Sequence, residues 1–133
     1  MEDPEQQLPD DILQRADARH GELAWRPSDI PAVIEAARQA NLVSLGGDLQ
    51  IRAPSGMWGE PIGVGIDTGR VLKGLPWDAQ VEESAEAALA EFQALRDKFD
   101  FKALAAEAYP TLVAEVDDPS EVIFFGWWVQ SRS

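Results

Sequence analysis

Apolar residues in the first forty positions recur at the three- and four-residue spacing of amphipathic helices. A helix is predicted over residues 9–19, because Pro9 suits a first helical turn and Gly21 ends the pattern. A second helix is predicted over residues 25–42, with Ser28 as its N-cap. The inward-facing positions of the two helices are Leu8, Ile12, Leu13, Ala16, Ile30, Val33, Ile34 and Ala37.

The period changes after these helices. Apolar runs become short and rich in β-branched residues, and glycine and proline interrupt them. This pattern predicts strands over residues 49–53 and 61–67, with a turn through 54–59 between them. Together they form a β-hairpin, 49–67, with a loop longer than the two-residue type.

The clearest helix is predicted over residues 78–99, with Asp78 as its N-cap. Its apolar positions repeat at spacings of three and four and form one narrow stripe, which consists of Val81, Ala85, Ala88, Phe92, Leu95 and Phe99. A further helix is predicted from Asp100 to Tyr109, where Pro110 kinks or ends it. Residues 111–116 fit either a helix or a strand.

The densest apolar segment is a strand predicted over residues 121–130. Alternate positions on a strand point to opposite faces, and here both faces are apolar: one carries Val122, Phe124, Gly126 and Trp128, and the other Ile123, Phe125, Trp127 and Val129. Either this is a central strand covered by helices, or one of its faces meets another protein.

These elements predict an α+β fold. A small antiparallel sheet, made of the hairpin 49–67 and the C-terminal strand 121–130, packs with about four helices. Residues 8–133 are expected to form a single domain, since 133 residues suit one hydrophobic core. Residues 1–7 are expected to be a disordered acidic tail.

The net charge of the chain limits the kinds of molecule that it is expected to bind. The chain has 24 acidic residues against 11 lysines and arginines, a formal net charge of −13. Such a field repels nucleic acid and anionic membranes and favours a basic protein partner. The acidic N-terminus lacks the features of a signal peptide, and the longest apolar run, Val122 to Val129, is too short to span a membrane. A cytoplasmic protein is therefore expected.

Several kinds of chemistry are disfavoured. There is no cysteine, so disulfides, thiol nucleophiles and zinc–thiolate sites are excluded. The single histidine, His20, is expected to cap the end of the first helix. Gly63 and Gly65 begin a dinucleotide fingerprint, but Thr68 stands where glycine is needed. No cofactor, metal site or catalytic residue is predicted.

The candidate binding residues lie on or beside the hairpin. Asp48, Glu60 and Asp67 are the carboxylates there, and Met57 and Trp58 stand at the predicted hairpin tip between two glycines. An aromatic residue with a methionine on a loop tip is typical of a contact anchor. The alternative is that Trp58 folds back onto the sheet.

The stretch "AWRPSDIPAVIEAARQANLVSLGGDLQIR", in a small acidic α+β chain, resembles bacterial toxin-immunity proteins. This resemblance implies an inhibitor that caps a basic toxin. The leading hypothesis is therefore a non-enzymatic protein-binding domain that engages a basic partner through acidic and aromatic surface.

Two other functions stay open. One is a small-molecule-binding or hydrolytic domain that uses the carboxylates near the hairpin; a pocket that joins two of them, with a raised pKa, would support it. The other is a homodimeric structural or scaffold protein without activity of its own, assembled through the last strand.

Overall fold

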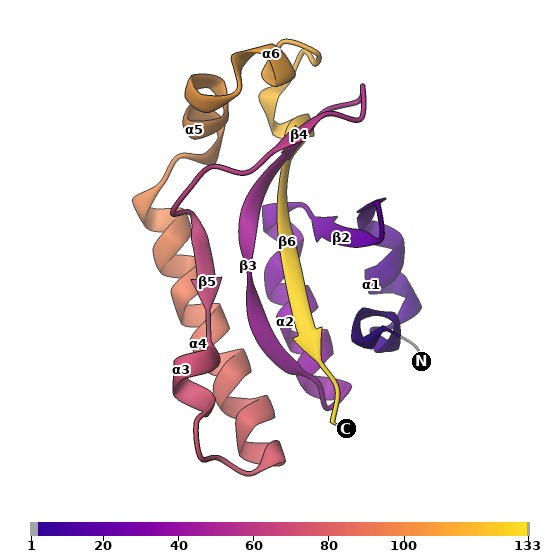
Figure 1. Ribbon diagram of the computed structural model, residues 1–133, viewed down its shortest axis with the longest axis vertical. Coiled ribbons are helices and arrows are strands. Elements are labelled where there is room, and N and C mark those ends of the chain that lie inside the picture. The colour runs from indigo at the N-terminus through magenta and orange to yellow at the C-terminus, as the bar shows by residue number, and fades with distance from the viewer. Residues whose placement is uncertain (1–2, 133) are drawn as a thin grey trace.

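A six-stranded antiparallel sheet forms one layer of the fold, and two helices cover one of its faces (Figure 1). The computed structural model describes residues 3–132. The strands are β1 (Asp17–Arg19), β2 (Glu22–Trp25), β3 (Val43–Arg52), β4 (Trp58–Gly59), β5 (Gly65–Asp67) and β6 (Ile123–Gln130). Their order is β1-β2-β6-β3-β4, and β5 also pairs with β3. The α+β fold with an antiparallel sheet is therefore confirmed.

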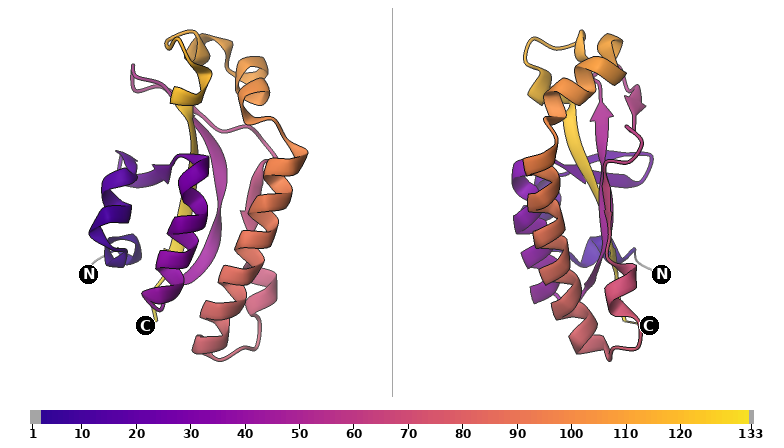
Figure 2. Two further views of the ribbon diagram at one scale, coloured as in Figure 1. Left: turned by 180° about the vertical axis from the view of Figure 1, so that it is seen from behind. Right: turned by 90° about the vertical axis from the view of Figure 1, so that its left-hand side faces the viewer.

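The helical segments lie between and around these strands. The α-helices are α1 (Asp10–Arg15), α2 (Ile30–Gln39), α3 (Gly69–Leu72), α4 (Trp77–Lys98), α5 (Phe101–Ala108) and α6 (Pro110–Val113). Three 3-10 helices are η1 (Pro4–Gln7), η2 (Pro27–Asp29) and η3 (Pro119–Val122). The side view shows α2 and α4 together on one side of the sheet (Figure 2, right). No helix of the described residues is both long and apolar enough to cross a bilayer.

The last strand lies inside the sheet, between β2 and β3. Its alternate residues Ile123, Phe125, Trp127 and Val129 are buried in the main core, as its two-faced apolar pattern predicts. Phe125 contacts Phe92 of α4 edge to face, with ring centroids 5.1 Å apart. The interior position and the helices over one face account for the aromatic residues of that face. The opposite face of the strand has no helix over its centre, and the alternative that one face meets another protein stays a prediction.

The long helix α4 presents its predicted stripe to the sheet. Val81, Ala85, Ala88 and Phe92 are buried. The side chain of Asp100 caps the next helix, α5, by accepting a hydrogen bond from the Ala103 amide at 3.2 Å. Of residues 111–116, which fitted either a helix or a strand, 111–113 belong to α6 and 114–116 form a turn, so the segment contains no strand.

The N-terminal region differs from the prediction. The first helix ends at Arg15, and residues 17–25 form a β1–β2 hairpin in place of a longer helix. His20 and Gly21 form its turn with φ angles of 53° and 79°, so His20 is not a helix cap. The predicted tail, residues 1–7, includes the short helix η1; residues 1 and 2 lie outside the described part of the chain.

The predicted bounds of three further elements differ from those in the structure: the return strand of the hairpin and the starts of two helices. The return strand predicted over 61–67 is split into β4 and β5, which pair with separate parts of β3. Gly63, at φ 83°, lies in the loop between them. Ser28 lies inside η2 and makes no cap hydrogen bond, whereas Pro31 does stand in the first turn of α2. The N-cap residue of α4 is Pro76, and Asp78, the predicted cap, is the second residue of the helix.

Candidate functional site

The face of the sheet opposite α2 and α4 has no helix over its centre, and we call it the open face (Figure 1). Alternation along β3 directs Leu49 and Ile51 toward the helices and directs Asp48, Gln50 and Arg52 to the open face. Gln50 and Arg52 are nonetheless only 1% exposed. Polar side chains are therefore buried on the side of the sheet without helices.

These three side chains form a chain of hydrogen bonds. Gln50 Nε2 donates to Asp48 Oδ1 at 3.0 Å, and Arg52 Nε donates to Gln50 Oε1 at 2.9 Å. Arg52 Nη1 donates to Asp17 of β1, at 2.7 Å to its carbonyl oxygen and 3.0 Å to Oδ2. Arg52 Nη2 has no partner among the described residues. The chain ties β3 to the β1–β2 hairpin across β6.

A glycine in β6 makes room for this crossing. Gly126 pairs with Asp48, and a Cβ atom on it would lie 2.4 Å from Gln50 Nε2 and 3.3 Å from Asp48 Oδ1. A side chain at this position would displace Gln50, so the polar chain depends on the glycine. Gly65 of β5 stands beside Asp48 on its other side and is exposed.

Trp58 folds back onto the sheet. The Arg52 guanidinium carbon lies 4.6 Å from the centre of the Trp58 ring, and His20 meets the same ring edge-on at 6.2 Å. Trp58 is half-buried in this stack, so it covers the polar chain and does not project as an isolated anchor. Its neighbour Met57 is 64% exposed at the hairpin tip.

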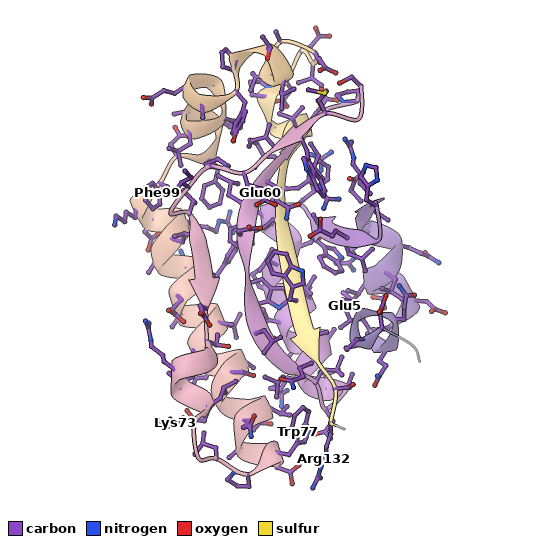
Figure 3. All side chains as sticks on the ribbon, in the orientation of Figure 1. Glu5, Glu60, Lys73, Trp77, Phe99 and Arg132 are labelled. Carbon is purple, nitrogen blue, oxygen red and sulfur yellow. The ribbon has the colours of Figure 1, made fainter. Side chains whose placement is uncertain are left out.

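Carboxyl groups crowd the centre of the open face. Burial raises the pKa of Asp48 above its ordinary value, and the charge of Glu22 raises it further, against the opposing effects of Gln50, Glu60 and Arg52. Loss of solvent around its carboxyl raises the pKa of Glu60 too, with the charges of Asp48 and Glu22 acting in the same direction. Glu60 remains exposed as a residue, and Figure 3 shows it on the open face near the middle of the molecule.

Asp48 and Glu60 lie close enough for each carboxyl group to affect the pKa of the other, and we call them the carboxyl pair. Neither residue forms an ion pair with any cation of the described chain. Arg52 is the nearby cation, and its ion pair is with Asp17.

A shallow pocket of about 460 Å³ lies beside this pair. It joins all three carboxylates that the sequence analysis selected, and its wall is the loop between β4 and β5; the lining residues are Asp48, Glu60, Pro61, Ile62, Gly63, Val64, Gly65, Ile66 and Asp67. Asp67 is exposed, and its Oδ1 accepts a hydrogen bond from the Gly69 amide at 2.9 Å. Met57 and Trp58 do not line the pocket.

The arrangement has two chemical capacities. A carboxyl pair with raised pKa values can transfer a proton or bind a cationic group, which would restore the ionised form of both acids. Across residues 3–132, no group of three or more histidine, cysteine, aspartate or glutamate side chains is placed to hold a metal ion.

Four contributors to the site were missed in the sequence: Gln50, Arg52, Glu22 and Gly126. The i, i+2 spacing of Asp48, Gln50 and Arg52 on one strand was the available signal, since it places them on one face. Glu22 comes from a hairpin that the sequence analysis replaced by a helix. Comparisons of this chain with family models, with curated proteins and with solved structures find no match.

Proposed function

We propose that the protein is a non-enzymatic binding protein that engages a basic protein partner through the open face of its sheet. The observation that carries this proposal is that Asp48 and Glu60 line one pocket on a face without a helix at its centre, and that neither forms an ion pair within residues 3–132. A lysine or arginine side chain of the partner would supply the positive charge that the pair lacks.

Electrostatics favours such an encounter at long and short range. A net charge of −13 speeds the approach of a basic partner. At contact, an ammonium or guanidinium group beside Asp48 and Glu60 favours the ionised form of both carboxyls and lowers both pKa values. Binding in this mode weakens with added salt.

Exposed apolar side chains are present on the same part of the chain. Ile62, in the loop between β4 and β5, lines the pocket of the carboxyl pair and is fully exposed, and Met57 is exposed farther away, at the tip between β3 and β4. Methionine and aliphatic side chains around a charged centre are able to exclude water from it. An inhibitor that caps a basic toxin, the role implied by the toxin-immunity resemblance, would use a surface of this kind.

The pocket favours one other function. It joins Asp48, Glu60 and Asp67, and two of these carboxyls have raised pKa values, which is the arrangement expected for a small-molecule-binding or hydrolytic domain. In that case one carboxyl of the pair would act as general acid and the other as general base.

Variants of the carboxyl pair distinguish the two functions. Wild-type protein, the Asp48→Asn/Glu60→Gln variant and a charge-matched control, Glu83→Gln/Glu86→Gln, serve as baits in lysate, and every captured protein is then purified and titrated. The control residues are exposed on α4, and both variants remove two negative charges. A basic partner should bind the control as wild type does and the pair variant at least about tenfold more weakly.

Calorimetry at increasing salt concentration measures the loss of affinity that is expected of a contact between opposite charges. A partner that binds the pair variant with unchanged affinity would overturn the proposed surface. A site that binds a small amine or sugar, with no protein partner captured, would select the second function.

A further inference from the structure

A second and larger pocket interrupts the helical layer on the opposite side of the sheet. Its lining residues come from the end of α4, the start of α5, the segment 26–28 before α2, and η3 with the start of β6. Figure 2, left, shows the helices of this region from behind. Its volume is about 780 Å³, and the lining residues are Arg26, Pro27, Ser28, Arg96, Phe99, Asp100, Phe101, Lys102, Ser120, Glu121 and Ile123. Ligand pockets for small molecules have volumes of roughly 300–1,000 Å³.

The pocket has an apolar base. Ile123, the first residue of β6, is only 4% exposed, and Phe99 and Phe101 are half-buried beside it. Phe101 also packs on the core residue Phe125, with ring centroids 6.3 Å apart. Two phenylalanine side chains and an isoleucine suit a flat apolar body.

The rim is cationic although the chain is strongly acidic. Arg26, Arg96 and Lys102 line the pocket, and within residues 3–132 none of the three forms an ion pair. Arg26 is fixed in place: Nη1 donates to the Ser120 carbonyl oxygen at 2.7 Å, and its guanidinium carbon lies 4.3 Å from the centre of the Phe124 ring. Its Nε and Nη2 groups have no hydrogen-bond partner within the described part of the chain.

The two acids of the rim are engaged by backbone amides. Asp100 Oδ1 accepts from the Ala103 amide at 3.2 Å, and Glu121 Oε2 accepts from the Asp118 amide at 3.4 Å in a capping box. They are therefore held by capping hydrogen bonds and form no ion pair with Arg26, Arg96 or Lys102, and three cations against two acids leave the pocket lining with one net positive charge. Lys102 and Arg26 also help to lower the pKa of Asp118, after the larger effect of its hydrogen bonds to Ser120.

We propose that this pocket binds a small organic anion, a carboxylate or a phosphate ester with a flat apolar body. The body lies on Phe99, Phe101 and Ile123, and Arg26, Arg96 and Lys102 hold the anionic group. This pocket shares no lining residue with the pocket of the carboxyl pair, so the proposal does not depend on the partner proposed above.

Three probes that share a naphthalene body test the proposal: 1-naphthyl phosphate, 1-naphthoate and the neutral 1-naphthol. Each is titrated into ¹⁵N-labelled protein at neutral pH and followed by amide chemical shifts. Both anions, or one of them, should shift amides of residues 96–102 and 120–123 in a saturable manner. Comparison of the two anions separates a phosphate ligand from a carboxylate ligand, and 1-naphthol should bind at least about tenfold more weakly, because it lacks the charged hydrogen bonds.

Charge-matched variants give the control. Arg96→Gln/Lys102→Gln should weaken anion binding about tenfold. Lys73→Gln/Arg132→Gln removes the same charge at the opposite end of the molecule, far from Phe99, and should leave binding unchanged (Figure 3). The substituted side chains of the pocket variant are exposed, and its thermal unfolding is measured to check that it folds.

The proposal is overturned by any of three results. These are equal binding of 1-naphthol and the anions, unchanged anion binding in Arg96→Gln/Lys102→Gln, and the absence of saturable shifts at low-millimolar anion.

Discussion

Alternate residues of β3 and β6 form the two faces of this strand pair. The two faces differ in the contacts that bury their side chains. Toward the helices, Leu49, Phe125 and Trp127 pack among apolar side chains. On the open face, Gln50 and Arg52 are equally buried, but they are joined by hydrogen bonds and covered by Trp58 in place of a helix.

The two faces therefore show two ways of burying side chains in one sheet, by apolar packing and by hydrogen bonds between polar groups. Apolar packing is non-directional and strong per residue, whereas buried polar groups stabilise only when their hydrogen bonds are satisfied. Natural proteins depart from simple burial patterns mostly at functional sites. The open face is such a departure, and its acidic centre is next to the buried polar chain.

Phe124 and Phe125 are adjacent in β6 and point to opposite faces, so substituting each one compares the contribution of the two faces to stability. Phe125→Ala should lower the free energy of unfolding by about 3–5 kcal/mol, because it removes a side chain fully buried against α4 and α5. Phe124→Ala, on the open face, should lower it less, since one side of that ring contacts Arg26 and not a helix. Guanidinium denaturation measures both, and an equal loss would refute the difference between the faces.

Removal of the buried arginine tests the polar chain. Arg52→Ala should destabilise the fold by about 3 kcal/mol, because Gln50 and Asp17 lose their partner and Trp58 loses its support. Arg52→Met keeps the apolar stem and should recover part of that loss. Calorimetric unfolding gives the values, and tryptophan fluorescence should report the movement of Trp58. A wild-type melting curve for Arg52→Ala would show that the chain is dispensable.

Addition of a methyl group at Gly126 gives a smaller effect. Gly126→Ala should cost about 1–3 kcal/mol, because the new Cβ atom meets Gln50 Nε2 at 2.4 Å. In a Gln50→Ala background the same substitution should cost less, since the obstructing amide is absent. A double-mutant cycle from urea denaturation measures this coupling; additive losses would mean that Gln50 does not lie over the glycine in solution.

The smallest expected effect is a pH dependence. The folded pKa of Asp48 is raised, so folding disfavours its ionised form: the penalty is absent below its unfolded pKa of about 4, and it is complete once the pH exceeds the folded value. Asp48→Asn should therefore raise Tm by at most a few degrees at pH 7 and leave Tm unchanged at pH below about 4. Melting curves across this range test it, and a stabilisation that persists at the acid end would point to a different cause.

The core of the fold was predictable from sequence for a physical reason. A segment with apolar residues on both faces, such as 123–129, favours an interior position in a small sheet, and the stripe of α4 gives that helix only one apolar side. The β1–β2 hairpin was missed, because the apolar spacing before Ala16 favours a helix and the turn depends on two residues, His20 and Gly21, in left-handed conformations.

The candidate site was predictable only in part. Sequence analysis selected Asp48, Glu60 and Asp67, and the structure places all three on one pocket. Met57 and Trp58 lie outside that pocket, since the hairpin tip extends beyond it. Gln50 and Arg52 were not expected to be buried, because polar residues at alternate strand positions usually mark a solvated face.

The interior position of β6 also affects how the chain folds while it is being synthesised on the ribosome. The β1–β2 hairpin and β3 are joined in the sheet through β6, and Trp25 pairs with Phe125, a hundred positions later in synthesis. Contacts of such long sequence separation form slowly. While residues 123–130 are still in the exit tunnel, the β1–β2 hairpin and β3 cannot be joined into one sheet. The apolar side of each part is then exposed, and a chaperone would protect it from aggregation.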